Sequence, residues 1–120
     1  MPTTEVEDLA KRVEASSNAD RDLRADVARV LRASYPAAAS AGQITDEVAA
    51  STDAILALVN AALPGWYLSI HGRARKAAGA WRCTLRRSDV RDDDEAIGVG
   101  EAHSLNLAIL AAVLRVAARQ

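Results

Sequence analysis

The hydrophobic pattern of this chain changes from a helical to a strand period across a single Pro64-Gly65 pair. Before this pair, apolar residues recur every three or four positions, which gathers them on one helical face. They are Ile55, Leu58, Val59, Ala62 and Leu63. Pro64 lacks an amide donor and Gly65 tolerates turn dihedrals, so the helix is expected to end here.

Two segments beyond the turn, Trp66 to His71 and Trp81 to Arg86, alternate between apolar and polar residues. Alternation of this kind places every second side chain on the same side of a sheet. It predicts an antiparallel hairpin with one buried side and one polar side. We expect Trp66, Trp81 and Cys83 to belong to the buried side, the cysteine as an unreactive small apolar group.

Capping residues and helix breakers define the other predicted elements. Thr4 and Glu7 have the spacing of a capping box, which predicts the start of a helix. The residue before Pro36 is disfavoured in a helix, so the second helix is expected to end at Ser34. Pro36 to Gly42 is interpreted as an irregular connection. The predicted helices cover about 4–14, 20–34, 52–63 and 104–118, and the predicted strands 66–71, 81–86 and 96–102.

This order, αααβββα, predicts an α+β fold in which a small antiparallel three-stranded sheet packs with about four helices. We expect residues 1–120 to form a single domain, and we leave open whether the N-terminal helix (residues 1–18) is only loosely attached to it. Half of the residues are apolar, but 27 are alanine and none is phenylalanine. The core is therefore expected to be thin and to use the two tryptophans as its bulky side chains.

Charge and cysteine content exclude few function classes but favour one location. A net charge of −1 gives no global electrostatic reason to bind nucleic acid or an anionic membrane. The single cysteine cannot form an internal disulfide, which fits a reducing compartment. The most apolar run, Leu105 to Ala118, is too short for a membrane span, and no leader sequence is apparent. We expect a soluble protein located in the cytoplasm.

The predicted hairpin is basic and the segment after it is acidic. Residues 66–88 carry six basic and no acidic side chains, whereas residues 89–103 carry six acidic and one basic. One interpretation is a nucleic-acid-binding or anion-binding patch on the polar side of the hairpin. It would comprise Tyr67, His71, Arg73, Arg75, Lys76, Arg82, Arg86 and Arg87. The other is that Asp89, Asp92, Asp93, Asp94 and Glu95 fold back and neutralise the patch. We favour neutralisation, because an adjacent acidic run repels phosphates within a Debye length of ~8 Å.

No motif in the chain predicts catalysis, a metal or a cofactor. Asp92 to Glu95 lack the alternating ligand spacing and central glycine of a calcium loop. His71 and His103 are too few for a zinc site without further ligands. No nucleophile elbow, phosphate-binding loop or paired-cysteine motif occurs. We therefore predict neither an enzyme nor a cofactor.

The chain resembles a family of small phage and prophage proteins, the phage ABA sandwich domain, from about Val6 to Ala118. The likeness lies in Asp20 to Leu23 at a helix start, Ser51 to Val59 leading to Pro64-Gly65-Trp66, Trp81 in the next strand, and Ala102 to Arg115. The family usually has threonine and proline at the start of the last helix, where this chain has Ser104 and Leu105. The resemblance implies an α-β-α arrangement and no established common activity, so it implies no catalytic residue here.

Two functional hypotheses follow. The first is a phage-type accessory protein that acts as a non-enzymatic protein-binding module, with an inhibitor of a host defence system, such as an anti-CRISPR protein, as a subtype. The alternative is nucleic-acid or small-anion binding through an arginine-rich sheet face. We expect the partner to be another protein and expect no contact with a membrane. Whether the chain associates with itself is left open. The candidate binding residues are Tyr67, His71, Arg73, Arg75, Arg82, Arg86, Arg87, Asp92, Asp93, Asp94 and Glu95.

Overall fold

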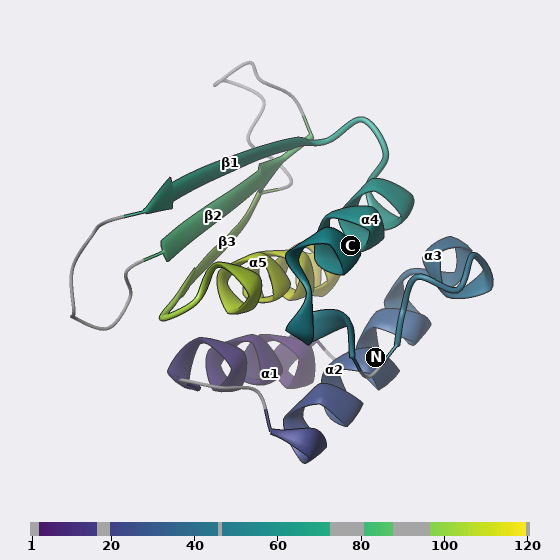
Figure 1. The fold of residues 1–120 in the computed structure, drawn as a ribbon, viewed down its shortest axis with the longest axis horizontal. Helices are drawn as coiled ribbons and strands as arrows, with labels where there is room; N and C mark the ends of the chain where they lie inside the picture. The colour runs from purple at the N-terminus through teal and green to yellow at the C-terminus, as the bar shows by residue number, and fades with distance from the viewer. Residues whose placement is uncertain (1–2, 17–19, 46, 73–80, 88–96, 120) are drawn as a thin grey trace.

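The computed structural model describes residues 3–16, 20–45, 47–72, 81–87 and 97–119, which form an α+β fold (Figure 1). Its three strands form an antiparallel sheet, as predicted, and their order in the sheet is β1-β2-β3. The helices are α1 (Thr3–Ala15), α2 (Arg21–Ser34), α3 (Pro36–Ser40), α4 (Thr52–Ala62) and α5 (Leu105–Arg119), with a short 3₁₀ turn η1 (Val48–Ala50). The strands are β1 (Tyr67–Gly72), β2 (Trp81–Arg86) and β3 (Ile97–Ala102).

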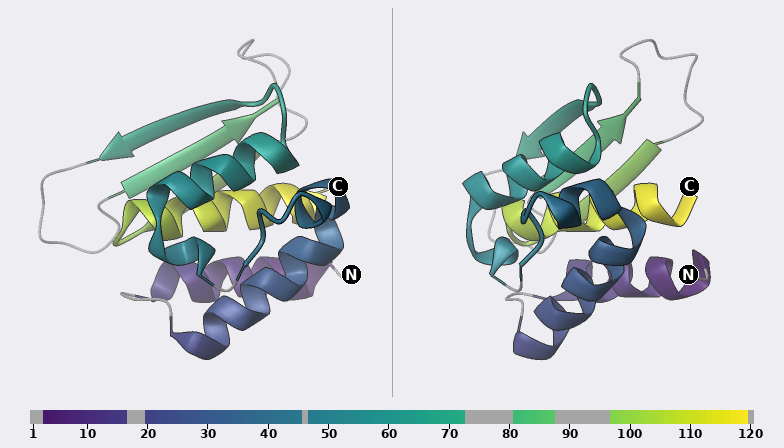
Figure 2. Two further views of the ribbon diagram at one scale, coloured as in Figure 1. Left: turned by 45° about the vertical axis from the view of Figure 1, so that its right-hand side comes forward. Right: turned by 90° about the vertical axis from the view of Figure 1, so that its right-hand side faces the viewer.

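The helix α5 lies between the sheet and the N-terminal helices (Figures 1 and 2). It contacts β2 and β3 on one side and α1 on the other. Ten of its 15 residues are buried, more than one amphipathic face can supply. Among the described helices, α5 is therefore the most deeply buried. The apolar stripe of α1, formed by Val6, Leu9, Ala10 and Val13, is buried in the same core.

Two glycines allow β3 to lie unusually close to α5. A Cβ built on Gly98 would overlap the carbonyl oxygen of Ala112, and one on Gly100 would overlap that of Ala108. Alanines on the facing side of the helix, including Ala108 and Ala112, are fully buried. Small residues on both elements let the backbones approach, which is how a core without phenylalanine reaches close packing.

The hairpin is antiparallel and has the predicted buried and polar sides. Leu68 pairs with Leu85 and Ile70 with Cys83, so the apolar side chains of both strands share the side that faces the helices. Cys83 and Leu85 are fully buried there, whereas Ile70 is 39% exposed. Trp66 and Trp81 are half-buried and pack against the core, in line with their predicted side.

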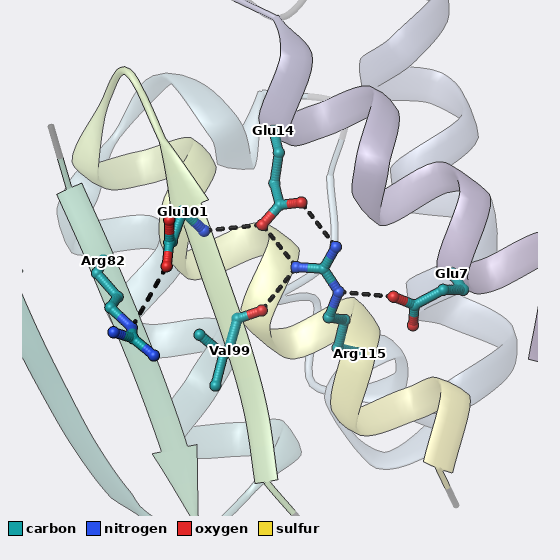
Figure 3. Close-up of polar contacts among 6 residues, drawn as sticks. All are labelled: Glu7, Glu14, Arg82, Val99, Glu101 and Arg115. Carbon is teal, nitrogen blue, oxygen red and sulfur yellow. Dashed lines mark hydrogen bonds and ion pairs between the residues drawn. The ribbon is translucent and has the colours of Figure 1, made fainter. Parts of the chain in front are cut away.

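The outer edge of β3 is closed by side chains from two helices (Figure 3). Glu14 of α1 accepts a hydrogen bond from the backbone N–H of Glu101, at 2.8 Å. Arg115 of α5 donates to the carbonyl oxygen of Val99 at 2.7 Å and holds both Glu14 oxygens, at 2.5 and 2.6 Å. Its Nε donates to Glu7 at 2.8 Å. An edge strand whose outward backbone groups are paired cannot accept another strand there.

Opposing effects act on the ionisation of this cluster. Burial raises the pKa of Glu14, but its hydrogen bonds with Arg115 and with the Glu101 N–H, together with the nearby positive charge, bring the pKa below its ordinary value. The hydrogen bond with Glu14 raises the pKa of Arg115. Both groups therefore stay charged at neutral pH and tie α1, α5 and β3 together.

Two local predictions were wrong. Thr4 and Glu7 do not form a capping box, because α1 already includes Thr3 and Glu7 instead accepts from Arg115. Pro36 to Ser40 is a short helix rather than an irregular connection. Proline is favoured in the first helical turn, where its missing N–H is no loss, and the alanines after it favour a helix. Ser104 caps the start of α5, because its side-chain oxygen accepts a hydrogen bond from the Leu107 N–H at 3.2 Å.

Candidate functional site

The face of the sheet that points away from α5 is the candidate functional site. We call it the open face and define it by Tyr67, Ser69, His71, Arg82, Thr84, Arg86, Val99 and Glu101. These residues alternate with the buried ones along each strand, so they share the opposite side. Within the described ranges, every helix lies on the other side of the sheet (Figures 1 and 2).

Strand register arranges the open face in three rows across the sheet. In the first row Tyr67 lies beside Arg86. In the second row Thr84 lies between Ser69 and Val99, and in the third Arg82 lies between His71 and Glu101. Tyr67 is 50% exposed, more than either tryptophan. The rows combine a phenol, aliphatic hydroxyl groups, an imidazole and guanidinium groups. Each of these groups can form hydrogen bonds with a ligand.

Charge on the open face is partly balanced within the face itself. Arg82 Nε lies 3.5 Å from Glu101 Oε1, and both side chains are more than half exposed (Figure 3). An exposed pair of this kind contributes little stability, about 0–1 kcal/mol, so a ligand can displace it. The face is therefore mixed in charge rather than purely basic.

The predicted basic residues do not all lie together. Tyr67, His71, Arg82 and Arg86 share the open face, as expected from their parity. Arg87 follows β2 and places its guanidinium 5.9 Å from the ring centre of Trp66, a cation–π contact at the end of the sheet. It therefore belongs to a different surface from Arg86.

Several candidate residues lie outside the described residues. They are Arg73, Arg75 and Lys76 after β1, and Asp89, Asp92, Asp93, Asp94 and Glu95 after β2. The proposed neutralisation of the basic hairpin by the acidic segment stays a prediction. On the described part of the face, a carboxylate does neutralise an arginine, but it is that of Glu101 in β3.

The polar cluster around Arg115 was missed by the sequence reasoning. A signal for it exists, because an arginine within an apolar helix needs a carboxylate or carbonyl partner once it is partly buried. Glu7 and Glu14 lie seven residues apart, two turns of α1, so they project from one face. Because all members of this cluster hold one another, it is a structural feature rather than a binding site.

A shallow depression of about 150 Å³ lies between α1 and α2. Its charged rim is internally paired: Arg12 bonds Asp26 at 3.2 Å, and Arg29 lies 3.7 Å from Glu5. These exposed pairs join the two helices. The depression offers no enclosed polar group to a ligand, so the open face remains the stronger candidate.

The buried groups of the fold offer little chemistry. Burial raises the pKa of Cys83 to about 12, which keeps the thiol protonated and unreactive, as predicted. Tyr35 donates to the carbonyl oxygen of Val113 at 3.0 Å and joins α2 to α5. Among the described residues, no group of three or more histidine, cysteine or acidic side chains is placed to hold a metal ion. None of the described helices is long and apolar enough to cross a membrane.

Comparison with known proteins found no matching family model, no matching curated protein and no matching solved structure. The resemblance to phage ABA sandwich domains therefore rests on the residues quoted for it above.

Proposed function

We propose that this chain is a small phage-type accessory protein that acts as a non-enzymatic protein-binding module through the open face of its sheet. The observation that carries the proposal is the one-sided burial of the sheet. Cys83 and Leu85 are fully buried on one side, while Tyr67, His71 and Arg82 are exposed on the other. Among the subtypes, an inhibitor of a host defence system such as an anti-CRISPR protein is the one that the phage resemblance favours.

The composition of the open face supports a protein partner. Tyrosine and arginine are enriched at the energetic centres of protein interfaces, because they combine a large contact area with a polar group. The mixed charge of Arg82 and Glu101 also suits a partner surface that carries both signs. The rigid scaffold below, in which α5 is packed against two strands, lowers the entropy lost on binding.

A capture experiment with matched variants tests this proposal. The chain is used as bait in lysate of its host, as wild type and as the variant Tyr67→Ala with Arg82→Ala. The control is Leu56→Ala with Arg21→Ala, which also removes one exposed large side chain and one exposed arginine, but from α4 and α2. A partner retained by wild type and control, and lost from the open-face variant, supports the proposal. Equal retention by both variants contradicts it.

Nucleic-acid or small-anion binding is the second candidate function. The observation that favours it is the pairing of Tyr67 with Arg86 in one row, because an aromatic ring beside a guanidinium can stack a base and contact a phosphate. Affinity for single-stranded DNA and RNA is measured against salt concentration. A steep loss of affinity with salt, abolished by Arg82→Ala with Arg86→Ala, supports this candidate. Absence of binding at low salt eliminates it.

A further inference from the structure

The two edges of the sheet differ in what happens to their backbone groups. In β3, the N–H of Glu101 and the carbonyl of Val99 point outward and are bound by Glu14 and Arg115 (Figure 3). Backbone groups of an antiparallel strand alternate in direction from residue to residue. Glycines 98 and 100 therefore point their backbone groups toward β2, and the alternation continues through the registered pairs into β1.

This alternation identifies the outward groups of β1. Tyr67, Ser69 and His71 pair with Arg86, Thr84 and Arg82, whose backbone groups face β1. Leu68 and Ile70 therefore direct their N–H and C=O groups away from the sheet. In the described part of the chain, no hydrogen bond from another element reaches these groups, in contrast to the outer edge of β3.

The side chains of β1 do not protect this edge. Natural edge strands are commonly blocked by lysine, proline, an inward-pointing charge or a bulge. The sequence of β1, Tyr-Leu-Ser-Ile-His-Gly, contains no lysine, arginine, carboxylate or proline. It instead exposes Tyr67 by 50% and Ile70 by 39%. Such an edge is suited to accept another strand.

The pattern of β1 is symmetric about Ser69. Leu68 and Ile70 flank Ser69 on the helix side, and Tyr67 and His71 flank it on the open face. If a second copy pairs antiparallel with this edge and is centred on Ser69, Leu68 of one copy lies opposite Ile70 of the other, both on the helix side. Tyr67 of one copy then lies opposite His71 of the other, both on the open face. Centring the copy on Leu68 or Ile70 would move His71 or Tyr67 opposite a residue outside the strand. Symmetry about one residue is what a two-fold contact between identical chains requires.

We propose that the outer edge of β1 is the contact between two copies of this chain, which pair antiparallel about Ser69. The two sheets become one continuous sheet, and both open faces lie on the same side of it. Leu68 and Ile70 of the two copies exchange backbone hydrogen bonds, and no like charges face each other across the contact. A contact made by one strand buries less than the ~800 Å² per partner of a standard interface. The dimer is therefore expected to dissociate on dilution.

Sedimentation velocity over a range of concentrations tests the contact. The wild-type chain is expected to shift from monomer to dimer as its concentration rises. Ile70→Lys places a charge at the edge and is expected to raise the dissociation constant about tenfold or more. Leu56→Lys, the same change at an exposed apolar residue of α4, is the control and is expected to leave it unchanged. A wild type that stays monomeric throughout, or a dimer that Ile70→Lys does not weaken, overturns the proposal.

Cysteine cross-linking tests the register independently of affinity. In the proposed pairing, Ser69 lies directly opposite its own copy in a non-hydrogen-bonded pair, where cross-strand side chains come closest. Ser69→Cys is expected to form a disulfide-linked dimer with diamide as oxidant. The wild type is the control, because its buried Cys83 cannot reach a partner. A mixture of the Tyr67→Cys and His71→Cys variants is expected to form a disulfide-linked dimer that contains one of each. Neither variant alone is expected to form a disulfide-linked dimer. Cross-linking of Tyr67→Cys alone, or none by Ser69→Cys, overturns the register.

Discussion

Replacing Gly100 by alanine tests whether β3 and α5 owe their close approach to the missing side chain. The new Cβ would overlap the carbonyl oxygen of Ala108 and lie 2.7 Å from the backbone nitrogen of Ala112 and 2.9 Å from the Cβ of Ala111. None of these atoms is the end of a flexible side chain, so strand and helix must separate. Overpacking typically costs 1–3 kcal/mol, and rigid obstacles place this case near the upper end, at about 3 kcal/mol.

Urea unfolding monitored by tryptophan fluorescence measures the effect. With a slope of about 1.5 kcal/mol per molar urea, a loss of 3 kcal/mol moves the midpoint by about 2 M. Gly72→Ala is the matched control, because the three described atoms nearest to its Cβ all belong to the ring of Trp81, the first at 2.6 Å, and that half-buried ring can move. We expect a clearly smaller loss for this control. A Gly100→Ala variant within 1 kcal/mol of wild type would refute the reasoning.

Further predictions concern the Arg115 cluster and the buried side chains of Cys83 and Tyr35. Arg115→Leu leaves two carboxylates without their cation and is expected to lower the free energy of unfolding by about 2–3 kcal/mol, as measured by urea unfolding. This loss is smaller than that for a fully buried ion pair, because the cluster is partly exposed. The folded-state pKa of Glu14 lies below its unfolded value near 4.5, so its stabilising contribution is complete above that value and is lost as pH falls through the folded pKa. Glu14→Gln should therefore flatten the acid side of a stability–pH curve. The buried thiol of Cys83 should resist a disulfide reagent at pH 8 in the folded chain and react once urea unfolds it. Tyr35→Phe removes a buried hydrogen bond and is expected to lower the free energy of unfolding by ~1 kcal/mol, as measured by thermal unfolding.

The elements that the sequence predicted correctly are those with a local signal. The helical period up to Leu63 and the alternation around Cys83 each arise from residues close in the chain, and both are confirmed in type and facing. Ser104 likewise caps a helix through its own side chain. In such segments, local propensity and tertiary packing favour the same conformation.

The features that could not be predicted depend on contacts between distant segments. Glu14 and Arg115 are 101 residues apart, and although an arginine within an apolar helix indicates that a partner is needed, it does not indicate which residue that partner is. Gly98 and Gly100 indicate a special backbone position, but only the packed structure shows that the reason is the approach of α5. The capping box failed because α1 already includes Thr3, and Glu7 instead accepts a hydrogen bond from the distant Arg115.

For the candidate site, the alternation of the strands was enough to place Tyr67, His71, Arg82 and Arg86 on one polar face. Carried one residue further, the same alternation puts Arg87 on the side of Trp66, where the structure has it, so the grouping of Arg87 with the open-face residues misapplied the pattern. The alternation could not indicate that Glu101 neutralises Arg82, because the pairing of β3 with β2 is set by the fold.

A map of amide shifts in the complex tests the central claim most directly. The isotope-labelled chain is titrated with the partner captured by the wild type, and the perturbed amides are located by nuclear magnetic resonance. The account predicts that the largest changes gather on Tyr67, Ser69, His71 and Thr84, with α1 and α2 little affected. Changes confined to α1, α2 or α4, with those four amides unmoved, would contradict it.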